Sequence, residues 1–141
     1  MIPVQKEIKL LNDKIQILYL VIYLGDLCMK KIAVAVKDTG KKVEHFGICE
    51  YFIVYDYDED NCNIEYDNVI FSSKDHKPDN EEWEKSADSI KNCDIVICEK
   101  IGPIAKAEVE MMNIKVIEEE GPVEDVLDKF IQIETKKKKI L

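Results

Sequence analysis

The stretch DIVICEKIGPIAKAEVEMMNIKVIEEEGP, residues 94–122, decides the fold class of this chain. It contains two short apolar runs, DIVIC and IKVIE, and runs of this kind are typical of buried strands. A Gly-Pro pair follows each run and favours the start of a helix, because proline is tolerated in the first helical turn. Strands that alternate with helices pair in parallel through right-handed crossovers. The stretch therefore predicts the parallel half of an α/β sheet.

The residues upstream predict the antiparallel half of the same sheet. The runs EYFIVYDYD and IEYDNVIF are rich in aromatic and β-branched residues, and a polar cluster separates them, so residues 50–71 are expected to form a hairpin. KIAVAV, further upstream, is typical of one more buried strand. The expected strands are 31–36, 50–58, 64–71, 94–98 and 114–118, and the expected helices run from Glu81 to about Asn92, from Gly102 to about Met112, and over 121–133.

These elements predict one α/β domain over residues 29–134, with a mixed five-stranded sheet flanked by helices. The expected order is strand, strand, strand, helix, strand, helix, strand, helix. Residues 1–28 are interpreted as an N-terminal extension, either an added helix or an upstream segment that a start-codon choice includes. Residues 135–141 form a lysine-rich tail that is expected to be solvated or frayed.

The composition limits the classes of partner and compartment. The chain has 141 residues and a net charge of −9, and all of its basic residues are lysines. Arginine is the usual residue for bidentate contacts to phosphate and guanine, so a nucleic-acid partner is disfavoured. The most apolar run, IQILYLVIYL at 15–24, is shorter than the roughly 20 residues that span a bilayer, and its flanks fit an export signal poorly. Five cysteines without a CxxC pair indicate reduced thiols, so a cytoplasmic protein without a membrane partner is expected.

Candidate binding residues gather where the two halves of the sheet meet. In open α/β sheets, ligands bind beyond the carboxyl ends of the strands, where the strand order switches direction. This rule predicts a site made of the loops 37–47 and 98–103, which we call the carboxyl-edge site. The helix start at Gly102 adds partial positive charge there, so an anionic ligand is expected. The first loop adds three cations, Lys37, Lys41 and Lys42.

Other side chains of these loops suit a transition metal or an iron–sulfur species. His45 and Cys49 flank the first loop, and Cys98 lies at the second. Thiolate and imidazole ligands favour such metals, and Gly47 allows the backbone to approach a ligand closely. Structural alternatives stay open, because His45 could be a hydrogen-bonded turn residue and Cys98 a small apolar core residue.

Two catalytic alternatives use residues of the same edge. Asp38 and Glu99 each follow a strand, and two carboxylates there could hold Mg²⁺ for phosphoryl transfer. Such a site would need a further convergent carboxylate, which the sequence does not identify. His45 and Cys49 could also form a nucleophilic dyad, but no oxyanion loop accompanies them. The chain contains no P-loop, GxGxxG or HExxH motif.

Two segments of the chain resemble a known family. They are MKKIAVAVKDTGKKVEHFGICEYFIVYD at 29–56 and NCDIVICEKIGPIAKAEVEMMNIKVIEEEGPVEDVLDKF at 92–130. HFG at 45–47 and IGP at 101–103 are their most specific parts. The segments are similar to the dinitrogenase iron–molybdenum cofactor biosynthesis domains, of the NifX and NafY type and of the C-terminal part of many NifB proteins. The resemblance covers about residues 29–133.

The resemblance implies a ribonuclease-H-like fold and a non-enzymatic role in metallocofactor assembly for nitrogen fixation. A protein of this kind transiently binds an iron–sulfur or iron–molybdenum cluster, or a precursor, and carries it between donor and acceptor assembly proteins. His45 of the HFG motif is then the leading metal ligand and Cys49 a further one. The cofactor-binding residues around them would be Phe46, Gly47, Gly102 and Pro103.

Some residues depart from the family pattern. Asn113 stands where a glycine is common, and Ser72 and Ser73 occupy a loop where several relatives carry a cysteine. The number of thiolate ligands therefore stays open. The family also has stand-alone members in organisms that do not fix nitrogen. A small-ligand or metal-binding regulatory module on the same fold is thus the second interpretation, and a Mg-dependent phosphotransfer enzyme the third.

Overall fold

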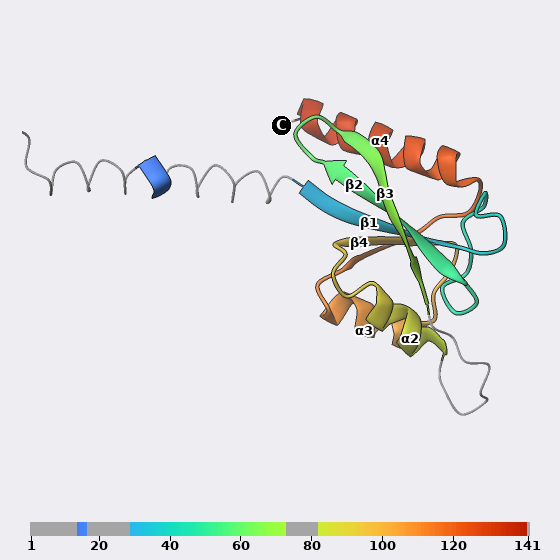
Figure 1. Cartoon of the computed structure of the whole chain (residues 1–141). Coiled ribbons are helices and arrows are strands. Elements are labelled where there is room, and N and C mark those ends of the chain that lie inside the picture. Colours follow the sequence, from blue (N-terminus) through green and yellow to red (C-terminus); the bar gives the residue numbers. More distant parts are fainter. Residues whose placement is uncertain (1–13, 17–28, 73–81, 141) are drawn as a thin grey trace, which may run out of the picture.

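A five-stranded sheet forms the middle layer of the computed structural model, with helices on both of its faces (Figure 1). The structure describes residues 14–16, 29–72 and 82–140. The elements in chain order are β1 (Met29–Val36), β2 (Tyr51–Asp58), β3 (Asn63–Phe71), α2 (Glu82–Ser89), β4 (Ile95–Cys98), α3 (Pro103–Met111), β5 (Lys115–Glu118) and α4 (Val123–Ile140).

The strands lie in the order β3-β2-β1-β4-β5. β1 pairs antiparallel with β2, and β2 pairs antiparallel with β3. β1 pairs in parallel with β4, and β4 with β5. The predicted mixed five-stranded sheet and the predicted order of elements are confirmed. Because β1 and β4 are parallel neighbours, their carboxyl ends at Val36 and Cys98 lie at the same edge of the sheet.

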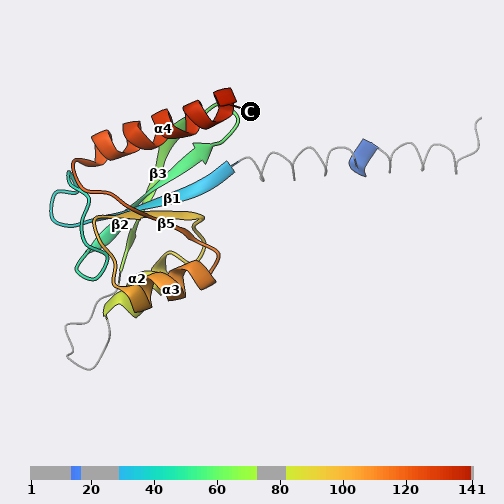
Figure 2. The ribbon, with the colours of Figure 1, turned by 180° about the vertical axis from the view of Figure 1, so that it is seen from behind.

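β1 separates two apolar cores, because successive side chains of a strand point to opposite faces. Ile32, Val34 and Val36 belong to the core beneath α4, whereas Ala33 and Ala35 belong to the core beneath α2 and α3. Figure 2 shows α4 over one face of the sheet and the other two helices over the opposite face. The side chains named here are all 0% exposed. The carboxyl-terminal part of β1, residues 32–36, is therefore covered on both faces, and the first loop of the carboxyl-edge site follows it directly.

The last helix differs from the prediction. α4 continues through the lysine-rich segment to Ile140, in place of a helix end at residue 133 and a frayed tail. Lysine has good helix propensity, and lysines near a helix C-terminus interact favourably with the helix dipole. Lys137 also pairs with Glu134, with 3.4 Å between Nζ and Oε1. The side chains of residues 136–139 are exposed, so the segment is solvated as predicted although it is helical.

Asn113 ends α3 in the left-handed conformation. Its φ is 65°, in a region that glycine favours and asparagine tolerates better than most other residues. The Ile114 N–H donates to the Val109 carbonyl at 3.4 Å, which closes the end of the helix before β5. Asn113 thus adopts the left-handed conformation that the turn requires, at a position where glycine is common in the family that the sequence resembles.

Several predictions fall outside the described residues. They concern the extension 1–28, apart from a short helical piece at 14–16, and the loop that contains Ser73 and His76. Ser72 is described, is 7% exposed, and donates its hydroxyl to the Glu50 carbonyl at 3.0 Å. Across the described part of the chain, no helix combines the length and the apolar character needed to cross a membrane.

Candidate functional site

The loops that follow β1 and β4 lie side by side, as predicted for the carboxyl-edge site. The Glu99 N–H donates to the Glu44 carbonyl, and the Phe46 N–H donates to the Lys100 carbonyl, each at 2.9 Å. Both bonds join backbone groups, so they hold the loops together independently of side-chain rotamers. They place His45 directly between the ends of two parallel strands.

A third loop, residues 119–122, completes this edge and was missing from the predicted site. It leads from β5 into α4 and runs beside the first loop (Figure 1). The Val43 N–H donates to the Gly121 carbonyl at 3.0 Å, and the Val123 N–H donates to the Lys41 carbonyl at 2.9 Å. The position of this loop could have been predicted from the sequence. The strand predicted at 114–118 is parallel to its neighbour, so the loop that follows it begins at the same edge of the sheet.

His45 begins a single helical turn at the surface. The N–H groups of Ile48 and Cys49 donate to its carbonyl at 3.2 and 3.0 Å. The Gly47 N–H donates to His45 Nδ1 at 3.0 Å. In a neutral imidazole whose Nδ1 accepts a hydrogen bond, the ring proton is on Nε2. The ring is half-buried and Nε2 has no partner among the described residues, so this nitrogen is available to a ligand.

The Cys49 thiol lies beneath this turn, in the core under α2 and α3. Its side chain is 0% exposed. Its Sγ donates to the Phe46 carbonyl at 3.3 Å and lies 3.8 Å from Ser86 Oγ of α2. The Phe46 ring is also fully buried and packs against Phe52, with 5.9 Å between the ring centroids. Cys49 and Phe46 therefore anchor the turn from below, while His45 is left at its surface.

Cys98 occupies the same core. It is 0% exposed. Burial, followed by the nearby Glu118 carboxylate and Cys49, raises the pKa of the Cys98 thiol to about 12. Metal ligation requires the thiolate, so this environment favours the structural alternative for Cys98. Within the described ranges, no three His, Cys, Asp or Glu side chains converge to hold a metal ion, and the predicted trio with His45 and Cys49 is no exception.

The predicted cationic surroundings lie at the surface of the site. Gly102 and Pro103 begin α3 and are exposed, and a Cβ atom built on Gly102 would meet nothing within 4 Å. The space beyond this helix start is therefore open. No ion pair engages the cations of the first loop within the part of the chain that the structure describes. These exposed residues are Lys37, Lys41 and Lys42.

The carboxylates of the phosphotransfer alternative receive no support from the structure. The backbone of Asp38 is held by the loop itself, because its N–H donates to Glu50 Oε1 at 2.8 Å and its carbonyl accepts from the Tyr51 hydroxyl at 2.9 Å. Asp38 and Glu99 belong to no group of three or more potential metal ligands in the described residues. The further carboxylate that such a site needs is therefore not found there.

Comparison with solved structures identifies proteins of the same fold. PH0822 is 22% identical, with a TM-score of 0.60, over 72% of this chain and 90% of its own. The apo form of the orange protein from Desulfovibrio gigas is 20% identical, with a TM-score of 0.57, over 75% of this chain and 90% of its own. The Methanocaldococcus jannaschii protein mj0327, which carries a provisional dinitrogenase name, is 21% identical with a TM-score of 0.53, over 74% of this chain and 90% of its own. At these identities the likeness shows the fold alone.

A search of curated proteins finds no match to this chain. Comparison with family models does find one. The model described as "Dinitrogenase iron-molybdenum cofactor" matches residues 29–133. This span begins at the first residue of β1, ends within α4 and contains all three loops of the carboxyl edge. The chain therefore belongs to the dinitrogenase iron-molybdenum cofactor family.

Proposed function

We propose that this protein binds an anionic iron–sulfur or iron–molybdenum cluster, or a precursor of one, at the carboxyl-edge site. In this proposal it carries the cluster in the cytoplasm from a donor to an acceptor among the metallocofactor assembly proteins. The observation that carries the proposal is the position of His45. Its imidazole stands at the surface between the joined strand ends, with Nε2 available, in a chain of this family.

Local electrostatics support an anionic cargo. The chain has a net charge of −9, which repels anions at long range. Lys37, Lys41 and Lys42 are exposed in the first loop, and the free N–H groups at the start of α3 point outward beside it. The three loops of this edge also carry Asp38, Glu44, Glu99, Glu119 and Glu120. The lysines therefore offset this acidic background for an anion that binds beside them, and their contribution depends on salt because they are exposed.

The ligand set suits transfer better than permanent storage. Stable iron–sulfur sites usually have four protein ligands. Here the carboxyl-edge site presents one imidazole at the surface, while Cys49 and Cys98 are both 0% exposed. A cluster held mainly through His45 would leave most of its metal coordination open to a partner protein. Such weak holding favours a binding and carrier role over catalysis.

The hydrogen bond from Gly47 distinguishes two ways of holding the cluster. With Nδ1 accepting, the Nε2–H group can donate to a cluster sulfide without any change in the turn. Metal coordination by Nε2 instead requires its proton to leave. If that proton moves to Nδ1, this atom can no longer accept from Gly47. The backbone amide of Gly47 therefore reports which of the two modes is used.

The test is anaerobic transfer from a cluster-loaded donor to the full-length protein. Wild type is compared with His45→Ala and with His76→Ala, which removes the other histidine of the chain as a matched control. Iron, molybdenum and sulfide contents are measured together with the visible absorption spectrum. We expect uptake by wild type and His76→Ala and a loss of uptake in His45→Ala.

Other outcomes are equally informative. Uptake that is unaffected in His45→Ala would shift the ligand role to the cysteines. Uptake by none of the three proteins would exclude the carrier role and leave the small-ligand regulatory module as the better interpretation. In that experiment, the Gly47 amide should exchange faster with solvent on loading if Nε2 coordinates a metal, because its bond to Nδ1 is lost, and should keep its exchange rate if Nε2–H donates to sulfide.

A further inference from the structure

α4 is too narrow to cover its face of the sheet. Five strands about 4.8 Å apart span roughly 19 Å between the outer strands, whereas a helix with its side chains is about 10–12 Å wide. Among the described residues, α2 and α3 lie over the opposite face, whereas α4 is the helix that lies over this face (Figure 2). Grooves on both flanks of α4 follow from this mismatch, and both are present.

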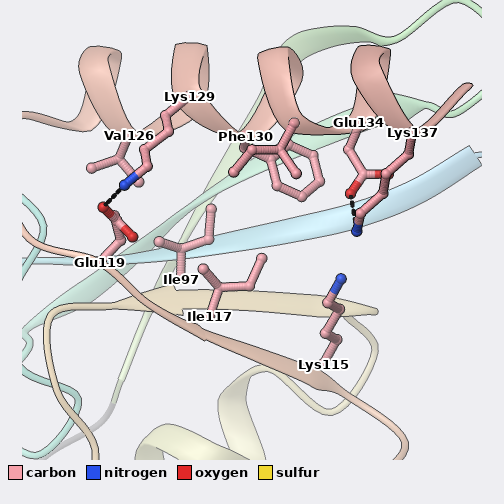
Figure 3. Close-up of a pocket in the computed structure, with 10 residues that line it drawn as sticks. Ile97, Lys115, Ile117, Glu119, Val126, Lys129, Phe130, Glu134 and Lys137 are labelled. Atoms are coloured by element: carbon pink, nitrogen blue, oxygen red, sulfur yellow. Dashed lines mark hydrogen bonds and ion pairs between the residues drawn. The ribbon is translucent and has the colours of Figure 1, made fainter. Parts of the chain in front are cut away.

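The groove on the β5 flank, which we call the β5 groove, has a volume of about 190 Å³. Figure 3 shows it between α4 and the strands β4 and β5. Its apolar lining is Ile97, Ile117, Val126, Phe130 and Ile133, and its charged lining is Lys115, Glu119, Lys129, Glu134 and Lys137. Apolar cavities of about 150 Å³ are large enough to hold benzene, so the β5 groove can hold an apolar group of about the size of benzene.

Ion pairing leaves one cation of the β5 groove without a partner. Lys129 pairs with Glu119 at one end, and Lys137 pairs with Glu134 at the other. Lys115 forms no ion pair or hydrogen bond with its side chain among the described residues. Figure 3 shows its ammonium group directed toward α4, below the Glu134–Lys137 pair. The groove therefore presents an apolar floor next to one ammonium group that no ion pair engages among the described residues, although Glu59, Asp94 and Glu134 line the adjoining hollow that Lys115 also borders.

The position of Lys115 follows from the period of the strand. Val116 packs in the core beneath α2 and α3, and Ile117 in the core beneath α4. Alternation along β5 therefore puts Lys115 on the same face as Ile117, at the groove. On the opposite face, Glu118 pairs with Lys106 of α3 at 3.2 Å. β5 therefore places Lys115 on the face covered by α4, and it places Glu118, which pairs with Lys106, on the opposite face.

The groove on the other flank of α4, which we call the β3 groove, has the opposite charge. It has a volume of about 430 Å³ and lies between α4 and the strands β2 and β3. Glu124 and Asp128 line it, and no lysine does. Its apolar lining includes Leu127 and Ile131 of α4. The same helix therefore separates a cationic groove from an acidic one, and this provides an internal control.

We propose that the β5 groove binds a small amphipathic anion, a monocarboxylate of about six to eight carbon atoms in all. The carboxylate is held by Lys115 and the apolar body lies on Ile117 and Phe130. This site shares only Glu119 with the loops of the carboxyl edge. The residues proposed to contact the anion, Lys115, Ile117 and Phe130, lie outside that edge, so binding in the groove does not require a cluster. It gives the domain a second ligand of a different chemical class.

The test titrates the full-length protein with hexanoate, 1-hexanol and hexylammonium at constant ionic strength. Binding is followed by isoleucine methyl NMR, because Ile117 and Ile133 line the β5 groove whereas Ile131 lines the β3 groove. We expect hexanoate to bind more tightly than hexanol, to shift Ile117 and Ile133, and to leave Ile131 in place. Lys115→Gln should weaken hexanoate about tenfold and leave hexanol unchanged.

Two variants make the result decisive. Lys136→Gln removes an exposed charge of α4 that lines neither groove, and it should leave hexanoate affinity unchanged. Ile117→Ala should weaken hexanoate and hexanol alike, because it removes part of the shared apolar floor. If Lys115→Gln and Lys136→Gln weakened hexanoate binding equally, the proposal would be overturned, because the effect would then be a general charge attraction. The proposal would also be overturned if hexylammonium bound as tightly as hexanoate, or if only the methyl resonance of Ile131 shifted on titration.

Discussion

The imidazole of His45 and the backbone of Gly47 form one hydrogen-bonded unit, in which the Gly47 N–H donates to His45 Nδ1 at 3.0 Å. This bond fixes the ring at the surface of the turn and leaves Nε2 as the outward nitrogen. The histidine of the HFG motif is thus both a turn residue and the best-placed ligand candidate. The two roles use different ring atoms, so they can be separated experimentally.

Asparagine and glutamine substitutions at residue 45 separate these roles. The Asn side-chain oxygen can occupy the position of Nδ1 and accept from Gly47, whereas Gln places its amide near the position of Nε2. We expect His45→Asn to keep the stability of wild type but to lose cluster uptake. His45→Gln should also lose the turn bond, at a cost of about 1 kcal/mol in the free energy of unfolding. Urea unfolding and anaerobic uptake measure the two effects, and normal uptake by His45→Asn would rule out Nε2 as the contact.

Gly40 should be the least replaceable residue of the first loop. Its φ is 72°, and a Cβ atom would lie 2.5 Å from the Tyr51 hydroxyl oxygen. We expect Gly40→Ala to cost roughly 1–3 kcal/mol in the free energy of unfolding, from backbone strain and this contact together. Adding Tyr51→Phe should relieve the steric part, so the double variant should be more stable than the sum of the single effects. Strict additivity in urea unfolding would show that the contact carries no cost.

Stability should fall at alkaline pH through Cys98. The folded thiol has a pKa of about 12, whereas an unfolded thiol ionises near about 8.5. Above that value the unfolded state loses a proton that the folded state keeps, so the free energy of unfolding decreases as pH rises from about 9 to about 12. Cys98→Ala removes this contribution. Its destabilisation relative to wild type, measured by urea unfolding, should therefore shrink between pH 8 and pH 10.5, and a constant difference would contradict the assignment.

Charge reversal of Lys41 and Lys42 should weaken cluster binding without unfolding the chain. Both side chains are exposed and form no ion pair with another described residue. The effect should be larger at low salt than at high salt, because exposed charges are screened. Reversing Lys91 and Lys136, which are exposed and lie outside the carboxyl-edge site, changes the net charge equally and serves as the control. Equal losses in the two double variants would remove a specific role for the loop.

A chain that begins at Met29 should fold without the extension. The buried apolar residues of both cores lie between Ile32 and Phe130, and β1 begins at Met29. We expect the free energy of unfolding of residues 29–141 to stay within about 1 kcal/mol of the full-length value. Urea unfolding and the dispersion of amide resonances test this expectation. Failure to fold would show that residues 1–28 are a structural part of the domain.

The strands could be predicted because a buried strand is evident from its own residues. IVIC at 95–98 and IAVAV at 32–36 are apolar throughout, and their side chains are buried on both faces of the sheet. The end of α4 could not be predicted in this way. Lysine is compatible with both a helix and a solvated tail, and the difference in propensity is only a few tenths of a kcal/mol per residue.

That the loops of the carboxyl edge meet could be predicted, but the burial of their individual side chains could not. Parallel pairing of the strands at 31–36 and 94–98 is enough to bring their following loops together. The burial of Cys49 depends instead on tertiary contacts, because its thiol meets the Phe46 carbonyl and Ser86 of α2. A spacing of four residues from His45 cannot reveal which of the two side chains faces solvent. The ligand set therefore remains the least predictable part of the site.

The central position of β1 also has a consequence for the order of folding. Its antiparallel partner β2 follows after a short loop, whereas its parallel partner β4 comes about sixty residues later, where the Asp94 N–H donates to the Lys31 carbonyl at 2.9 Å. Closing that long segment costs more chain entropy than forming the local hairpin. A chain with only its first half formed already carries His45, but it lacks the Lys100 carbonyl that holds Phe46. In the proposed carrier role, the site is complete only after β4 has paired with β1, so we expect a chain with only its first half formed to bind no cluster.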